Sequence, residues 1–114
     1  MADHLQTYIG HVQKEITILN DVSRRFSVQS LQNDPLAFRG AIYAIQTISE
    51  AVRHFPISVT ELYPNIRWRE IRAIGNFTRH EYAALQAAVI WEIIVFRVPE
   101  LQEVILKIQA DIVE

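Results

Sequence analysis

The stretch DPLAFRGAIYAIQTISEAVRH, residues 34–54, decides the fold class of this chain. Asp34 can accept hydrogen bonds from the first free N–H groups of a helix, and Pro35 suits the first helical position because it has no N–H to leave unpaired. Residues 55–57, FPI, stop the pattern. We therefore expect a helix from residue 35 to about 54. Its apolar residues recur every three or four positions, at Leu36, Phe38, Ile42, Ile45, Ile48 and Val52.

The same helical periodicity runs through most of the chain, and neither an alternating strand pattern nor an internal repeat occurs. Ser58 and Glu61 have the spacing of a capping box and predict a short turn that ends at Pro64. We expect an all-α, up-and-down bundle of four to five main helices, formed by one domain over residues 1–114. The other predicted helices cover residues 3–24, 68–82 and 87–96, and the last begins at Pro99.

Two of the predicted helices, 35–54 and 87–96, are apolar on more than one side. Tyr43 adds to one of them, and Trp91 and Phe96 add to the other. A small bundle cannot bury all of this surface inside one chain. The surplus predicts a helix-mediated interface, most simply a homodimer.

The composition removes several classes of protein. The 114 residues include no cysteine, which excludes a disulfide scaffold, a thiolate metal site and a cysteine nucleophile. The beginning of the chain lacks the basic and apolar segments of a signal peptide. The longest apolar stretch, AALQAAVIWEIIVF, contains Gln86 and Glu92 and is too short to span a bilayer. We expect a cytoplasmic protein without a membrane partner.

The charge is unevenly distributed. The net charge of −2 argues against non-specific nucleic-acid binding. The segment from Arg53 to His80, however, contains five arginines and only two acidic residues, Glu61 and Glu70. Its net charge is therefore +3, and that of the rest of the chain is −5. Arginine suits bidentate contact with phosphate or carboxylate. The segment therefore fits an anion site, and it also fits an arginine-rich surface without a ligand.

On an ideal helix, the polar residues of the predicted 68–82 segment share one face of roughly 140°. Arginine can neutralise a phosphate, an amide can donate hydrogen bonds to it, and histidine can transfer a proton near neutral pH. Such a face fits metal-free RNA cleavage. It also fits an ordinary solvated face with His80 near the end of the helix. The residues concerned are Arg69, Arg72, Asn76, Arg79 and His80.

Gly75 lies inside this predicted helix, where glycine costs about 1 kcal/mol relative to alanine. We expect a compensating reason, such as the close approach of another helix or a ligand, or a bend.

The other histidines carry weaker signals. His4, His11 and Glu15 share a helix face, but the chain lacks the Glu-x-x-His pair of di-metal bundles. We predict no metal and no other cofactor. His54 is expected to cap the end of its helix.

The chain resembles the HepT-like (DUF86) proteins of the HEPN superfamily over nearly its whole length. The resemblance rests on three segments that agree in order, spacing and residue types. They are LAFRGAIYAIQTISEAVRHF, with Arg39; YPNIRWREIRAIGNFTRHEY; and VIWEIIVFRVPELQEVI.

The family motif is an arginine, four to six residues, a histidine, and often a tyrosine two positions later. Asn76, His80 and Tyr82 fit this motif directly, but Gly75 stands where the arginine is expected. Arg79 or Arg72 could take over the phosphate role, or the activity could be lost.

The resemblance implies a toxin of a type VII-like toxin–antitoxin pair: a homodimeric, metal-independent endonuclease acting on tRNA or mRNA. Its implied partner is a nucleotidyltransferase antitoxin that silences it by adenylylating Tyr82. Two alternatives remain. One is a catalytically weakened module that pairs with the nucleotidyltransferase and binds RNA or nucleotide without cutting. The other is a plain interaction bundle.

Overall fold

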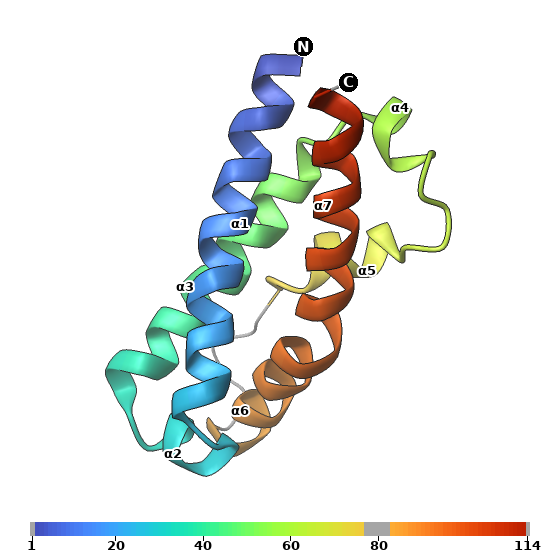
Figure 1. Ribbon diagram of the computed structural model, residues 1–114. Coiled ribbons are helices and arrows are strands. Elements are labelled where there is room, and N and C mark those ends of the chain that lie inside the picture. Colours follow the sequence, from blue (N-terminus) through green and yellow to red (C-terminus); the bar gives the residue numbers. More distant parts are fainter. Residues whose placement is uncertain (1, 77–82, 114) are drawn as a thin grey trace.

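The computed structural model of the chain describes residues 2–76 and 83–113, and every regular element within them is helical (Figure 1). The prediction of an all-α fold is confirmed. The long helices are α1 (Ala2–Arg25), α3 (Pro35–Arg53), and the succession of α6 (Ala83–Glu92), η1 (Ile93–Arg97) and α7 (Val98–Val113). The short ones are α2 (Val28–Gln32), α4 (Ile57–Thr60) and α5 (Trp68–Ala73).

The long helices lie along one axis, α1 in one direction and α3 and α7 in the other (Figure 1). Helix α1 descends from the N-terminus, α3 returns beside it, and α7 climbs to end near the start of α1. Because α3 and α7 point the same way, the chain must cross back between them. The short helices α4 and α5 lie on this return path, so α5 comes to lie against α3.

Helix α3 begins as its sequence predicts. Asp34 Oδ1 accepts a hydrogen bond from the Ala37 N–H at 3.0 Å, and Pro35 occupies the first turn. His54 is the C-cap residue, as expected.

Helix α2 was not among the expected elements. Its cap is reciprocal: Ser27 Oγ accepts from the Ser30 N–H at 3.1 Å, and Ser30 Oγ accepts from the Ser27 N–H at 2.9 Å. The capping box predicted further on is wrong. Pro56 is the N-cap of α4, Ser58 lies inside that helix, and Glu61 is its C-cap. Proline fixes the backbone angle two residues earlier than the serine signal suggested.

The predicted break at Pro99 is also wrong, because the chain stays helical from Ala83 to Val113. The Val98 N–H bonds to the Ile93 carbonyl, five residues back, which is the pattern of a π-helix. Proline lacks an N–H, and π turns and prolines both bend helices. Helix α6 is accordingly inclined to α7 in Figure 1, and the helix bends without ending.

The predicted long helix from Trp68 to Tyr82 is wrong over residues 74–76, because α5 ends at Ala73, and residues 77–82 lie outside the described residues. The Ile74 N–H bonds to the Ile71 carbonyl at 3.3 Å, and the Asn76 N–H bonds to the Ala73 carbonyl at 3.0 Å. These three-residue spacings close the helix into a turn.

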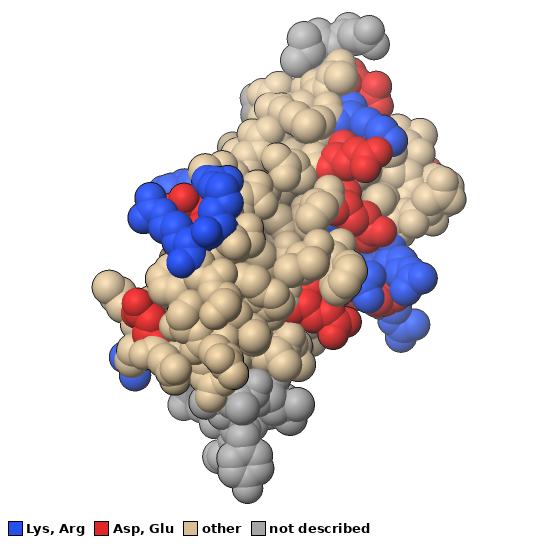
Figure 2. Space-filling view, turned by 60° about the horizontal axis from the view of Figure 1, so that its bottom comes forward, with Lys and Arg blue, Asp and Glu red and all other residues tan. Residues whose placement is uncertain are grey.

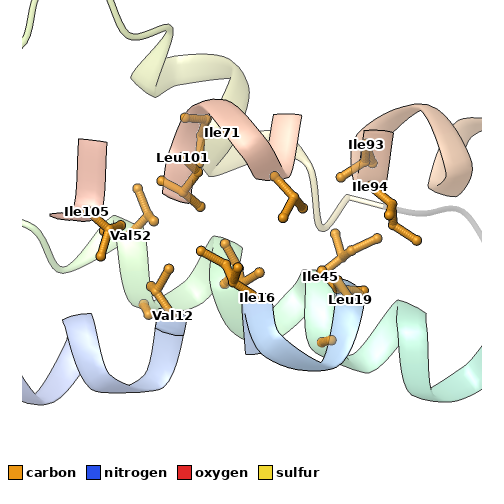
Figure 3. Packing of buried hydrophobic residues seen from close by; sticks show 14 of the residues in the cluster. Val12, Ile16, Leu19, Ile45, Val52, Ile71, Ile93, Ile94, Leu101 and Ile105 are labelled. Carbon is orange, nitrogen blue, oxygen red and sulfur yellow. The ribbon is translucent and has the colours of Figure 1, made fainter. Parts of the chain in front are cut away.

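The core lies where α1, α3, α5 and the α6–α7 succession meet (Figure 3). Trp68 fixes the start of α5, because its indole Nε1–H donates to the carbonyls of Thr60 at 3.0 Å and Tyr63 at 3.1 Å. The side chains labelled in Figure 3 are Val12, Ile16, Leu19, Ile45, Val52, Ile71, Ile93, Ile94, Leu101 and Ile105.

Much of the apolar surplus in the sequence is absorbed by this core, since Ile90, Ile93 and Ile94 are buried. Other large apolar side chains remain on the surface: Leu36 is 86% exposed and Phe96 is 68% exposed. Among the described residues, no helix combines the length and apolarity needed to cross a membrane.

Candidate functional site

The described part of the candidate site is the turn that ends α5 and rests on α3. The carbonyl of Arg72 accepts three hydrogen bonds there. Ser49 Oγ donates at 2.5 Å, and Arg53 donates through Nε at 3.3 Å and through Nη2 at 3.1 Å. The last carbonyls of a helix lack partners within the helix, and a cation is favourable beside them. Two side chains of α3 therefore fix the end of α5.

Arg53 joins this helix end to the next polar residue. Its Nη2 also donates to Asn76 Oδ1 at 3.2 Å. Asn76 is exposed and immediately precedes residues 77–82. Sequence reasoning counted Arg53 in the basic segment but assigned it no place in the site. The arginine cluster was its only signal, because the contact depends on how α5 packs against α3.

Gly75 is needed for that packing. An added Cβ would lie 3.0 Å from Ser49 Cβ and 3.1 Å from Gln46 Cα, closer than ordinary contacts allow. The expectation that another helix approaches Gly75 closely is confirmed. Since one of the two atoms belongs to the backbone of α3, position 75 has no room for a larger residue unless α5 moves.

The remaining predicted site residues are placed only in part. Arg72 is half-buried, and its carbonyl belongs to the cluster described above. The wheel projection that joined it to Asn76 does not apply, because the helix ends at Ala73. Arg53 connects the two residues instead. Arg79, His80 and Tyr82 lie outside the described residues.

Glu50 is the acidic neighbour of this cluster. It lies 3.6 Å from Arg53 Nη1 and 3.6 Å from His54 Nε2. His54 also stacks on Tyr8, with ring centroids 4.4 Å apart and an angle of 4° between the rings. The end of α3 thus carries a guanidinium, a carboxylate and an imidazole on one surface.

Much of the positive charge is paired. Glu70 Oε1 lies 2.9 Å from Arg97 Nη2, and Glu70 Oε2 lies 3.5 Å from Arg67 Nη1. On the face drawn in Figure 2, the larger groups of Lys and Arg adjoin or enclose Asp and Glu, and a broad uncharged area lies between them. That face carries no continuous basic band.

The described residues include no group of three or more His, Asp or Glu side chains close enough to hold a metal ion, and this includes His4, His11 and Glu15. A cavity of about 310 Å³ lies between the loop at Tyr63 and α7. Its lining contains none of the site residues, so it is a separate feature.

These features define an all-helical protein with an arginine–asparagine cluster at the end of a short helix. Residues 12–108 match the family Ribonuclease HepT-like, and the chain belongs to this family. The resemblance seen in the sequence is confirmed.

Curated relatives share this match. "Putative RNase TTE0752" of Caldanaerobacter subterraneus subsp. tengcongensis is 28% identical over 89% of this chain and 90% of its own length. "Probable ribonuclease HepT" of Thermococcus cleftensis is 23% identical over 83% and 86%, respectively. "Gamma-glutamylcyclotransferase and putative RNase MJ0434" of Methanocaldococcus jannaschii is 22% identical over 98% of this chain but only 50% of its own length. No solved structure matches the chain.

Proposed function

We propose that this chain is an RNA endonuclease whose active site is built around His80. Membership of the Ribonuclease HepT-like family is the observation that carries the proposal. The names of the relatives add support, since they describe RNases. The cluster of Arg53 with Asn76 also supports it, because it sets a guanidinium directly before the segment that contains His80.

The proposed reaction is an internal transesterification that needs no metal ion. A base removes the proton of the ribose 2′-hydroxyl, and the 2′-oxygen forms a bond to phosphorus. The bond from phosphorus to the 5′-oxygen breaks, and an acid protonates the departing oxygen. His80 supplies the acid or the base, and a guanidinium stabilises the charge that builds up on the phosphorane. Asn76 donates to the same phosphate.

The proposed active unit is a homodimer, which would supply two histidines, one as acid and one as base. Exposed apolar residues on α3 and η1 support this proposal. Leu36, Tyr43 and Phe96 are all more than half exposed in the single chain. Sedimentation of the purified chain tests it, and a strictly monomeric protein would contradict it.

The proposed biological role is that of a cytoplasmic toxin controlled by a nucleotidyltransferase antitoxin. Tyr82, two residues after His80, is the proposed target of adenylylation. Each adenylate carries a negative phosphodiester, which would compete for the guanidinium and repel RNA. Mass spectrometry of the chain incubated with a nucleotidyltransferase and ATP tests this role. An unmodified Tyr82 would count against it.

The decisive experiment compares the wild-type protein with His80→Ala on total RNA and on tRNA, each with EDTA present. We expect cleavage by the wild type and a loss of at least about 100-fold in His80→Ala, the scale of general acid–base catalysis. Equal rates of RNA cleavage by the wild type and His80→Ala would contradict the ribonuclease proposal.

A second candidate follows from Gly75. The contact of this residue with α3 leaves no space for the motif arginine. A protein that lacked any replacement would bind RNA or nucleotide, and would pair with the nucleotidyltransferase, without cutting. Salt-sensitive RNA affinity without cleavage would favour this candidate.

A further inference from the structure

The proposed reaction requires an arginine side chain that binds the RNA phosphate. Arg53 is the arginine whose side chain touches a proposed site residue within the described chain. Its Nη2 lies 3.2 Å from Asn76 Oδ1, and its Nε and Nη2 lie 3.3 and 3.1 Å from the Arg72 carbonyl. These contacts fix the plane of the guanidinium in advance, as bidentate recognition of an anion requires.

The donors of Arg53 are only partly used. Arginine carries five N–H groups, two of them on Nη1. Within the described residues, Nη1 makes no hydrogen bond, and its nearest acidic neighbour is Glu50 at 3.6 Å. The Arg53 side chain is 45% exposed, and that of Glu50 is 66% exposed. An ion pair this exposed contributes little, so a phosphate oxygen can replace it.

Gly75 and Arg53 belong to one arrangement. Gln46, Ser49 and Arg53 follow one another at spacings of three and four, so they lie on one face of α3. Gly75 packs closely against Gln46 and Ser49. Arg53, further along the same face, donates a hydrogen bond to Asn76, the residue after Gly75. The glycine that excludes an arginine at position 75 is therefore what brings the turn within reach of an arginine on α3.

We propose that Arg53 binds the scissile phosphodiester of RNA at this site, in the role that the family motif gives to an arginine at position 75. The inference rests on the proposed ribonuclease function. Asn76 is then a shared element, since it accepts from Arg53 through Oδ1 and keeps its amide N–H groups for the ligand.

Two substitutions separate this role from a purely structural one. Both Arg53→Lys and Arg53→Gln lose the forked contact with Arg72 and Asn76, but only Arg53→Lys keeps the charge. A structural role predicts that the two variants behave alike. A phosphate role predicts that they differ in the salt dependence of RNA binding, because each neutralised phosphate of a single strand adds about 0.7 to the slope of log affinity against log salt.

The experiment measures the affinity of a fluorescent single-stranded RNA for proteins that also carry His80→Ala, over a range of salt concentrations. Arg24→Gln is the matched control, since Arg24 pairs with Asp21 on α1. We expect Arg53→Gln to weaken binding at least tenfold and to lower the slope by about 0.7, and we expect Arg53→Lys to keep the slope. With His80 intact, Arg53→Gln should cleave at least 100-fold more slowly than Arg24→Gln.

The outcomes distinguish this inference from the function on which it rests. Cleavage by the wild type with equal slopes in Arg53→Lys and Arg53→Gln overturns the Arg53 proposal alone. RNA binding that depends on the Arg53 charge, without cleavage by the wild type, overturns the ribonuclease proposal and leaves Arg53 as an RNA contact. Absence of both binding and cleavage overturns both.

Discussion

Gly75 shows how a single missing side chain can set the geometry of a site. Its backbone angles are accessible to any residue, so conformational freedom is not the reason for glycine here. The reason is contact with Ser49 and Gln46 on α3. The sequence could reveal that a glycine in a helical segment needs a compensation, but it could not reveal which atoms lie opposite.

We predict that Gly75→Ala lowers the free energy of unfolding by about 1–3 kcal/mol, the usual cost of forcing an extra carbon into a packed contact. Gly10→Ala is the control, because an added Cβ at this position of α1 meets nothing within 4 Å. That substitution should stabilise the protein by about 0.5–1 kcal/mol. Urea denaturation of both variants measures the difference. Equal effects of the two substitutions would show that the contact with α3 is not tight.

Arg53 marks the limit of residue-level reasoning from sequence. The resemblance directed attention to arginines near His80, and Arg72 and Arg79 are close to it in the chain. Arg53 is distant in sequence and reaches Asn76 only because α5 crosses α3. Helix crossings of this kind arise from packing, which local periodicity does not encode.

At the level of elements, local signals succeeded where they agreed with packing. The N-terminus of α3 has both a capping carboxylate and a proline, and it begins where they predict. Pro99 gave an equally strong local signal and was misread, since the π turn before it lets the helix continue. Val98 and Leu101 are buried there, so tertiary contacts favour continuity.

The reciprocal cap of helix α2 is a local signal that the sequence analysis missed, and its contribution to stability can be tested. The cap of Ser27 and Ser30 holds a single turn in place, and the turn buries Leu31 completely. Ser27→Ala should lower the free energy of unfolding by about 1 kcal/mol, because one backbone N–H loses its acceptor. Ser23→Ala is the control, since Ser23 Oγ only donates to the Asn20 carbonyl within α1. Equal stability of Ser27→Ala and wild type in urea would contradict the capping role.

For the whole molecule, the fold class was predictable because helical periodicity recurs in every long segment. The topology was less so. The return from α3 to α6 was expected to be a short turn ending at Pro64 and a long helix over residues 68–82, but within the described residues it consists of α4, the shorter α5 and turns. Side chains hold this return in place: Trp68 bonds to the Thr60 carbonyl at the end of α4, and Tyr63 bonds to Asp111 of α7, which is distant in sequence.

The contact between Tyr63 and α7 makes the stability of the whole molecule depend on pH. The Tyr63 hydroxyl donates to the Asp111 carboxylate, and this hydrogen bond raises the pKa of Tyr63 from 10.0 to about 12, with burial and the negative charge of Asp111 acting in the same direction. The folded state therefore holds the phenolic proton more tightly than the unfolded state. The resulting stabilisation is complete below pH 10 and is lost as the pH rises from 10 towards 12.

We predict that Tyr63→Phe lowers the free energy of unfolding by about 1 kcal/mol at neutral pH, the scale of one hydrogen bond. The difference from wild type should shrink as the pH rises through 10 to 12. In this range the unfolded wild-type chain loses its Tyr63 proton, whereas the folded contact must retain it, and phenylalanine has no such proton. Urea denaturation of both proteins at intervals between pH 7 and 12 measures this difference. Tyr43→Phe is the control, since Tyr43 is two-thirds exposed on α3 and its hydroxyl makes no hydrogen bond with the described residues. A constant difference between wild type and Tyr63→Phe across that range would show that the loop does not depend on the Tyr63 proton.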